Sequence, residues 1–262
     1  MILRNPVIID YPDRIEADLQ VFDEDFLLMN QLDKENFKLT ENGVQREIVS
    51  ITCPPKHPPE PFSSVLTVDV SGSMQGGGIK TARAAVEAWV EAMDAGKSEC
   101  AITSFNDRNN LIQDFTSDKN ALKNKTGVLI SGGGTSLSAA LIDQQSGGLI
   151  VAERGRYNRV VVLLTDANMD AGNILKNSII NKADSIDARI FVVVLNAFIT
   201  DALKSISTDT GGEWYEMVTS KEQAKKIFIQ ILQMANNTYD HCEIVWKSGG
   251  CDLTRDVELT YN

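Results

Sequence analysis

The chain has 262 residues, with 25 Lys and Arg against 36 Asp and Glu, so its formal net charge is −11. This acidic balance, without a basic stripe, argues against a nucleic acid or an anionic membrane as partner. An apolar fraction of 43% is typical of a globular protein with a real core, and no apolar run approaches the roughly 18–20 residues of a membrane span. Direct insertion of this chain into a membrane is therefore not expected.

The N-terminal segment, about residues 6 to 53, is predicted to form β structure. Apolar and polar residues alternate in part through IEADLQVFDE, and two further strands flank Asn42-Gly43, a dipeptide typical of a tight hairpin turn. The proline-dense stretch CPPKHPPEP, residues 53–61, cannot continue a helix or a central strand. It marks the clearest domain boundary in the chain.

From Pro61 the pattern changes to strands that alternate with helices. The run RVVVLLTDA is rich in Val and Leu, which is typical of a parallel strand covered on both faces. This alternation predicts a doubly wound α/β fold with a mostly parallel, six-stranded sheet. The expected strands are SSVLTVDV, ECAITSFND, NLIQDFT, RVVVLLTDA, RIFVVVLN and EWYEMV, and the expected helices lie after Gly78, at 118–127, at 135–154, at 172–187, from Thr200 and from Ser220.

The tail, CEIVWKSGGCDLTRDVELTY, returns to β character after the last helix. The N-terminal strands alone are too few for a stable sandwich, and the tail supplies two more strands of the right kind. We therefore expect the α/β domain, residues 61–238, to be inserted into an immunoglobulin-like β-sandwich made of residues 1–60 and 239–262.

None of the four cysteines has the C-x-x-C spacing of a zinc or redox site. Cys100 begins a predicted buried strand and is interpreted as a core thiol. Cys242 and Cys251 flank a Gly-containing turn, so the pair is either a disulfide or two free thiols. A tight hairpin would place position 255, not 251, opposite Cys242, so the bridge requires a bulged turn.

The run VLTVDVSGSM, residues 65–74, ends an apolar strand in Asp69 and two serines. A buried carboxylate is costly unless it is paired, hydrogen-bonded or bound to a metal. In the strand order 3-2-1-4-5-6, Asp69 and Asp166 end neighbouring strands at the point where the order reverses, the usual ligand crevice of such sheets. Thr135 lies in a third loop, SGGGTSLSAAL. Two carboxylates and three hydroxyls form an all-oxygen set that suits Mg²⁺ or Mn²⁺.

These residues resemble the metal-ion-dependent adhesion site of von Willebrand factor A-like domains. Residues Asp69 to Ser73 match D-x-S-x-S, with Gly134-Thr135 and Thr165-Asp166 as the other two loops. The resemblance implies that Ser71, Ser73 and Thr135 ligate the metal through their hydroxyls, and that Asp69 and Asp166 ligate directly or through water. It also implies an open coordination position for an acidic side chain of a partner protein. Ala167 departs from the glycine that the family usually has there.

An enzyme is the less favoured interpretation. The glycines after Ser71 do not have the G-x-x-x-x-G-K-[ST] spacing of a phosphate-binding loop, and neither His57 nor His241 comes from the α/β core. An Mg²⁺-dependent phosphoesterase remains open on chemistry alone.

We therefore interpret the chain as a non-enzymatic protein of metal-dependent binding and adhesion. The segment FDEDFLLMNQLDKENFKLTENGVQREIV resembles immunoglobulin-like strands of bacterial surface proteins, which favours an extracellular, cell-surface or periplasmic setting. The first residues lack the regions of a signal peptide, so the chain is either cytosolic or part of an exported protein. The alternative function is a cytosolic scaffold subunit of a multiprotein machine.

Overall fold

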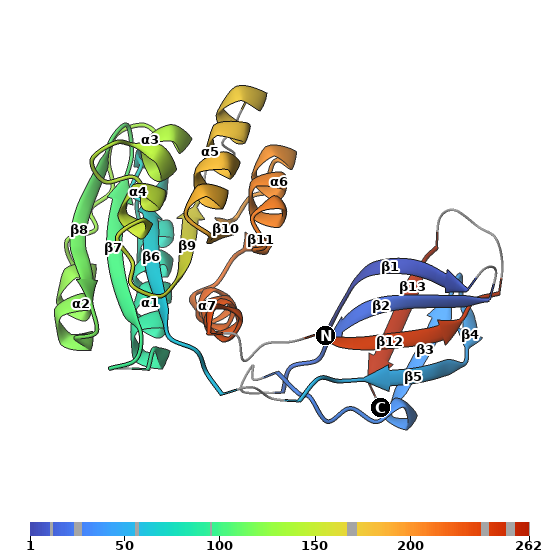
Figure 1. Cartoon of the computed structure of the whole chain (residues 1–262). Coiled ribbons are helices and arrows are strands. Elements are labelled where there is room, and N and C mark those ends of the chain that lie inside the picture. The colour runs from blue at the N-terminus through green and yellow to red at the C-terminus, as the bar shows by residue number, and fades with distance from the viewer. Residues whose placement is uncertain are drawn as a thin grey trace. The chain divides into compact units, whose positions relative to one another are not determined.

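In the computed structural model the chain forms two compact units, Met1–Pro58 with Asn237–Asn262 and Pro59–Asn236 (Figure 1). We call them the β unit and the α/β unit. The α/β unit is inserted between the two parts of the β unit, so the predicted architecture is confirmed. The structure describes residues 1–10, 13–23, 28–55, 58–94, 96–166, 172–236, 241–249 and 255–261.

The β unit is built from two antiparallel sheets, in the strand orders β1-β2-β12-β5 and β13-β3-β4. The two strands of the tail, red in Figure 1, lie among the blue strands of the N-terminal segment. They do not pair with each other as a hairpin, because β12 and β13 belong to different sheets. The bounds are β1 Ile2–Asp10, β2 Arg14–Gln20, β3 Phe37–Glu41, β4 Val44–Arg46, β5 Ile48–Thr52, β12 Cys242–Lys247 and β13 Val257–Tyr261, with a short 3₁₀ helix at Lys34–Asn36.

The core of the β unit depends on residues that are far apart in the chain. In β2, Ile15, Ala17 and Leu19 alternate with more exposed residues, as expected when one face of a strand is buried. Trp246 of β12 lies opposite Ile15, and both are almost fully buried. The hairpin at Asn42 and Gly43 is confirmed, since both residues have the positive φ that this turn requires.

Cys242 forms a disulfide with Cys53. This pairing rules out a disulfide between Cys242 and Cys251, and it also rules out a free thiol at Cys242. Antiparallel pairing of β12 with β5 sets Glu243 opposite Thr52, which brings the preceding and following cysteines together. Cys251 itself lies outside the described residues.

The α/β unit contains a six-stranded sheet in the order β11-β10-β9-β6-β7-β8. In chain order this is 3-2-1-4-5-6, as assumed from the sequence. All neighbours are parallel except β7 and β8, which form an antiparallel hairpin. The strands are β6 Phe62–Asp69, β7 Glu99–Phe105, β8 Asn109–Thr116, β9 Asn158–Thr165, β10 Ala188–Leu195 and β11 Trp214–Val218.

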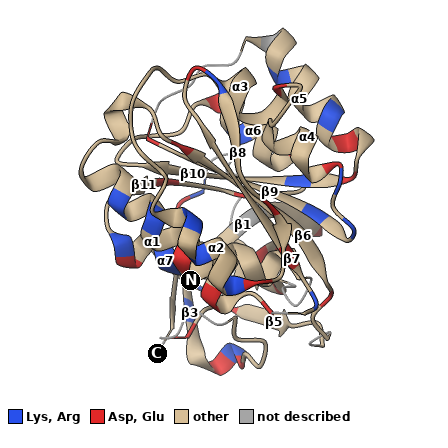
Figure 2. Cartoon of the chain, turned by 90° about the vertical axis from the view of Figure 1, so that its left-hand side faces the viewer, with Lys and Arg blue, Asp and Glu red and all other residues tan. Residues whose placement is uncertain are grey.

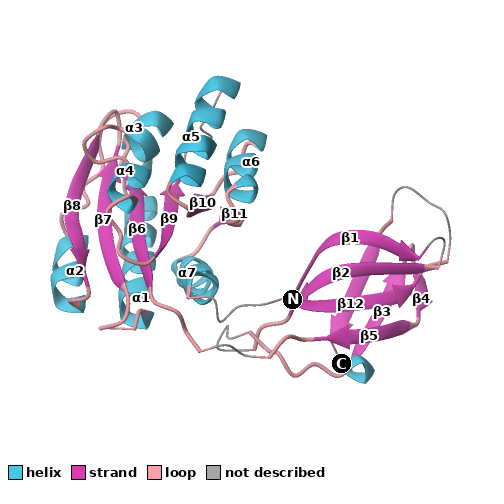
Figure 3. Cartoon of the chain, viewed as in Figure 1, coloured by secondary structure: helices cyan, strands magenta, loops and turns pink. Residues whose placement is uncertain are grey.

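Helices cover both faces of this sheet, which explains why its central strands β6 and β7 are buried along their whole length. The helices α1, α2 and α7 gather on one side, and α3, α4, α5 and α6 on the other; their charged residues lie mostly on outward surfaces (Figures 2 and 3). The helices are α1 Gly77–Ala92, α2 Lys119–Thr126, α3 Leu137–Ile142, α4 Gly148–Ala152, α5 Asn173–Ser185, α6 Asp201–Asp209 and α7 Lys221–Ala235, with a 3₁₀ helix at Gly72–Met74.

The predicted helix at 135–154 is two short helices, α3 and α4. Gly147 separates them, and a Cβ there would lie 2.5 Å from the backbone nitrogen of Asp143, so only glycine fits this close approach. Trp89 is a core residue, and its indole N–H donates to the Ser64 hydroxyl. Trp214 is only partly buried, and the Lys204 ammonium lies 4.6 Å from the centroid of its ring. None of the described helices has both the length and the apolar character needed to cross a bilayer.

Candidate metal-binding site

The site lies at the carboxyl ends of β6 and β9, where the strand order reverses. These strands are parallel neighbours with Val68 opposite Leu164, so Asp69 and Thr165 end them side by side. The structure therefore brings together the D-x-S-x-S loop and the Thr165-Asp166 loop, as the sequence predicts.

Asp69 is fully buried, and both of its carboxylate oxygens accept hydrogen bonds. The Ser71 backbone N–H donates to Oδ1 at 2.7 Å, and the Thr165 hydroxyl donates to Oδ2 at 2.5 Å. Burial raises the pKa of Asp69; these hydrogen bonds act in the opposite direction, and the nearby Asp166 adds to the rise. Thr165, which was predicted only as part of the motif, thus orients the first carboxylate.

A chain of hydroxyls connects the first loop to the last. The Ser71 and Ser73 hydroxyl oxygens lie 3.0 Å apart, and the Ser73 hydroxyl donates to Asp166 Oδ1 at 2.8 Å. Ser71 is buried, whereas Ser73 is exposed and Asp166 is half-buried. The oxygen atoms therefore run from the interior of the unit to its surface.

Backbone hydrogen bonds fix the glycine loop that carries Thr135 against the first loop. The Gly72 N–H donates to Gly133 O at 2.9 Å, and the Gly132 N–H donates to Val70 O at 2.7 Å. Gly133 has φ of 86°, a conformation that side chains rarely adopt. All five predicted ligand residues thus belong to loops that meet at one edge of the sheet.

Sequence reasoning missed Asn106 and Asp107, which hold the glycine loop from the other side. The Asn106 side chain donates to Gly132 O at 2.8 Å, and Asp107 Oδ2 accepts from the Gly134 N–H at 2.9 Å. Both residues follow β7, the neighbour of β6, so the predicted strand order would have placed them at this edge.

Comparisons with known proteins agree with this geometry. Residues 64–168 match the family model of the von Willebrand factor type A domain, and these residues include all three loops. The α/β unit is a von Willebrand factor A-like domain. We call it the A domain from here on.

Solved structures support the same fold. A von Willebrand factor type A protein from Catenulispora acidiphila is 14% identical, with a TM-score of 0.56 over 90% of this chain and 52% of that one. The von Willebrand domain of the type V pilus tip protein Mfa5 from Porphyromonas gingivalis is 14% identical, with a TM-score of 0.54 over 69% of this chain and 96% of that one. The minor pilin PilB from Streptococcus sanguinis is 14% identical, with a TM-score of 0.51 over 90% and 78%. The comparison with curated protein sequences gives no match.

In the A domain, Thr135 does not cap the helix that follows it. Ser136 is the N-cap of α3, and its hydroxyl accepts from the Ala139 N–H. The Thr135 hydroxyl makes no hydrogen bond with another described residue, and it is half-buried beside the site. It is thus available as a ligand, whereas Ala167, Asn168 and Asp170 lie outside the described residues.

The donor set of the A domain fits a hard divalent cation. Within the described ranges, no lysine or arginine pairs with Asp69 or Asp166, so the buried carboxylate has hydrogen-bond donors but no positive partner. Those ranges also hold no group of three or more His, Cys, Asp and Glu side chains placed to hold a metal ion. Two carboxylates with three hydroxyls suit Mg²⁺ or Mn²⁺, and the absence of nitrogen and sulfur ligands disfavours zinc.

Proposed function

We propose that the A domain binds a protein partner through a site that holds Mg²⁺ or Mn²⁺. Ser71, Ser73 and Thr135 would supply hydroxyl oxygens, and Asp69 and Asp166 would supply carboxylates directly or through water. A bound cation would offer a remaining coordination position to an acidic side chain of the partner.

The observation that carries the proposal is the state of Asp69. Its carboxylate is fully buried and hydrogen-bonded on both oxygens, yet it has no cationic partner among the described residues. An isolated buried charge is unfavourable, whereas a divalent cation would compensate both Asp69 and Asp166. The hydrogen bonds keep the carboxylate oriented and the serine hydroxyls aligned before any cation arrives.

We also propose an adhesive role outside the cytosol. The structural relatives include a pilus tip protein and a minor pilin, which fits a module that binds proteins at a cell surface. The Cys53–Cys242 disulfide fits an oxidising compartment and argues against a cytosolic scaffold. Both histidines fall outside Pro59–Asn236, which leaves the A domain without a histidine base and favours a non-enzymatic function.

The test is Mn²⁺ binding to the full chain, followed by electron paramagnetic resonance of the free ion. We expect one Mn²⁺ per chain, displaced by Mg²⁺, and at least a hundredfold weaker binding to Asp69→Asn. The matched control is Glu99→Gln, which removes a buried carboxylate from the opposite edge of the same sheet and should leave binding unchanged. Wild-type protein without a stoichiometric site, or Asp69→Asn with an intact one, would overturn the proposal.

A further inference from the structure

Ile174, Ile130 and Phe198 are the three most exposed large apolar side chains of the described residues, with exposed fractions of 87%, 74% and 68%. Single exposed apolar residues are ordinary. These three, however, all belong to segments at the carboxyl edge of the sheet. Ile130 lies two residues before Gly132, Ile174 is in the first turn of α5 beyond Asp166, and Phe198 follows β10.

The segment that carries Ile130 is held in place. Leu129 is fully buried, and Arg83 donates to Leu129 O at 2.7 Å, while the Gly132 N–H bonds to Val70 O. Ile130 is thus exposed between Leu129, whose side chain is buried, and Gly132, whose backbone is hydrogen-bonded. It cannot turn inward without breaking these contacts.

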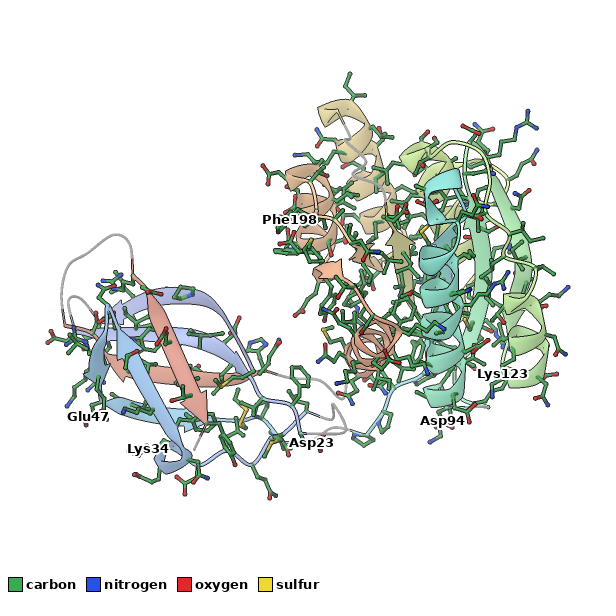
Figure 4. All side chains as sticks on the ribbon, turned by 180° about the vertical axis from the view of Figure 1, so that it is seen from behind. Asp23, Lys34, Glu47, Asp94, Lys123 and Phe198 are labelled. Carbon is green, nitrogen blue, oxygen red and sulfur yellow. A yellow bond between two sulfur atoms is a disulfide. The ribbon has the colours of Figure 1, made fainter. Side chains whose placement is uncertain are left out.

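Phe198 is presented in a similar way, and Figure 4 shows it at the outer surface of the A domain, beside α6. Its loop is pinned to β11, because the Asn196 N–H donates to Val218 O, the Met217 N–H donates to Ala197 O, and the Ile199 N–H donates to Glu216 Oε2. Met217 has φ of 53°, an uncommon conformation for a side chain of its size, and it is also exposed. The register shift between β10 and β11, together with the uncommon backbone conformation of Met217, thus holds Phe198 and Met217 in the solvent.

The distances are compatible with one interface. β9 lies between β10 and β6, the strand that ends at Asp69, so Asp69 and β10 are about 10 Å apart. Val194 of β10 pairs with Thr165 of β9, and Phe198 follows Val194 by four residues. Ile130 is two residues from a direct hydrogen bond to the first loop. A standard protein interface covers about 800 Å² on each partner, a disc roughly 30 Å across. The candidate metal site, Ile130 and Phe198 all fit within a disc of this size.

We infer that this edge is a docking surface for a protein segment whose acidic residue is flanked by bulky apolar side chains. The inference rests on the proposed function, since the acidic residue would reach the site at Asp69, while Ile130 and Phe198 would contact its apolar neighbours. Rigid, exposed apolar side chains favour a protein ligand, because they bury area without losing freedom on binding. A sugar ligand would leave these apolar side chains in water.

The experiment uses the immobilised full chain in Mg²⁺ and a displayed library of random peptides, each with one fixed Asp or Glu. We expect enriched peptides to carry Phe, Leu, Ile or Trp within a few positions of the acid. Phe198→Ser and Ile130→Ser should each weaken binding at least tenfold while Mn²⁺ binding stays unchanged. Val44→Ser, which alters an apolar side chain 52% exposed on the β unit, is the matched control and should have no effect.

The inference would be overturned if the selected peptides shared only the acidic residue, or if the wild type enriched no more peptides than the Asp69→Asn variant does. It would also be overturned if the Phe198→Ser and Ile130→Ser variants bound the selected peptides as well as the wild type does. Analytical sedimentation of the protein alone tests whether a second copy of the chain occupies this surface. A dimer that is lost in the Phe198→Ser variant would also overturn the inference. A failure of the proposed function is distinguishable, since it would appear as absent Mn²⁺ binding, independent of any peptide.

Discussion

Cys53 and Cys242 form a disulfide that joins the end of β5 to the start of β12, the two strands between which the A domain is inserted. On the A-domain side of the same two connections, the Glu60 N–H donates to Asn236 O at 2.8 Å. The outgoing and returning segments are thus joined twice, once covalently and once by a backbone hydrogen bond. A folded A domain therefore keeps the two ends of its insertion close together.

This relationship sets the expected effect of the disulfide. The cysteines are 189 residues apart, but a folded A domain reduces the loop that the disulfide closes to about 15 residues, for which the chain-entropy account gives about 3 kcal/mol. We expect Cys53→Ser with Cys242→Ser to destabilise the β unit by about that amount and to leave the A domain unchanged. The measurement is amide hydrogen exchange, which compares the protection of β2 and β12 in the β unit with the protection of β6 and β9 in the A domain. Equal loss of protection in both sets of strands would contradict the prediction. The control is Cys100→Ser, which replaces a buried free thiol of the A domain without breaking a disulfide.

Asp69→Asn should not destabilise the metal-free protein. Burial raises the pKa of Asp69 above its usual 3.8, so the folded state binds the proton more tightly than the unfolded chain. The metal-free wild type therefore loses stability as the pH rises from 3.8 through the raised pKa, and the variant lacks this loss. Asn keeps the shape, accepts from the Ser71 N–H and can donate to the Thr165 oxygen.

The measurement for Asp69→Asn is urea unfolding at pH 7. In EDTA we expect the variant to be at least as stable as the wild type. With Mg²⁺ at a hundred times its dissociation constant, the wild type should gain about 2.7 kcal/mol and the variant nothing. A variant that is clearly less stable in EDTA would show that the carboxylate is needed for folding itself.

Thr135 and Ser136 are adjacent hydroxyls with different expected roles. Ser136→Ala removes the N-cap of α3 and should lower stability by about 1 kcal/mol without loss of Mn²⁺ binding. Thr135→Ala removes a proposed ligand and should weaken Mn²⁺ binding at least tenfold with little change in stability. Thermal unfolding in EDTA and Mn²⁺ titration separate the two effects. If the two variants behave alike in both measurements, the division of roles is wrong.

Glu99 should make the A domain sensitive to acid. Burial raises the pKa of its carboxyl, but hydrogen bonds from Arg156 and Ser63 and the Arg156 charge outweigh burial, so the net pKa lies below the usual 4.5. A lowered pKa contributes stability that is complete above 4.5 and is lost as the pH falls through the folded value.

Glu99→Gln should therefore cost about 2 kcal/mol at pH 7, and the difference from the wild type should shrink in acid. Urea unfolding at pH 7 and at pH 3 measures it. Glu47→Gln is the control, because Glu47 pairs with Lys247 on the exposed surface of the β unit and should matter little (Figure 4). A difference that stays constant with pH would rule out the ionised carboxylate as the cause.

The sequence by itself predicted most strands and helices of the A domain and the loops that carry the proposed metal ligands. A continuous apolar run such as that of β9 is typical of a strand covered on both faces, and the D-x-S-x-S stretch directly follows another buried strand, β6. These are local patterns, because periodicity and turn chemistry act over a few residues. With the reversal of strand order they place Asp69 and Asp166 at one edge.

The tertiary structure alone decided which distant segments meet. Cys53 pairs with Cys242 because β5 and β12 are neighbours, whereas the sequence offered a local bridge between Cys242 and Cys251 or two free thiols there. Asn106 and Asp107 brace the glycine loop, and Ser136 rather than Thr135 caps α3. Phe198 and Leu129 are both apolar, yet only one is buried, because burial depends on what packs against each side chain across the whole fold.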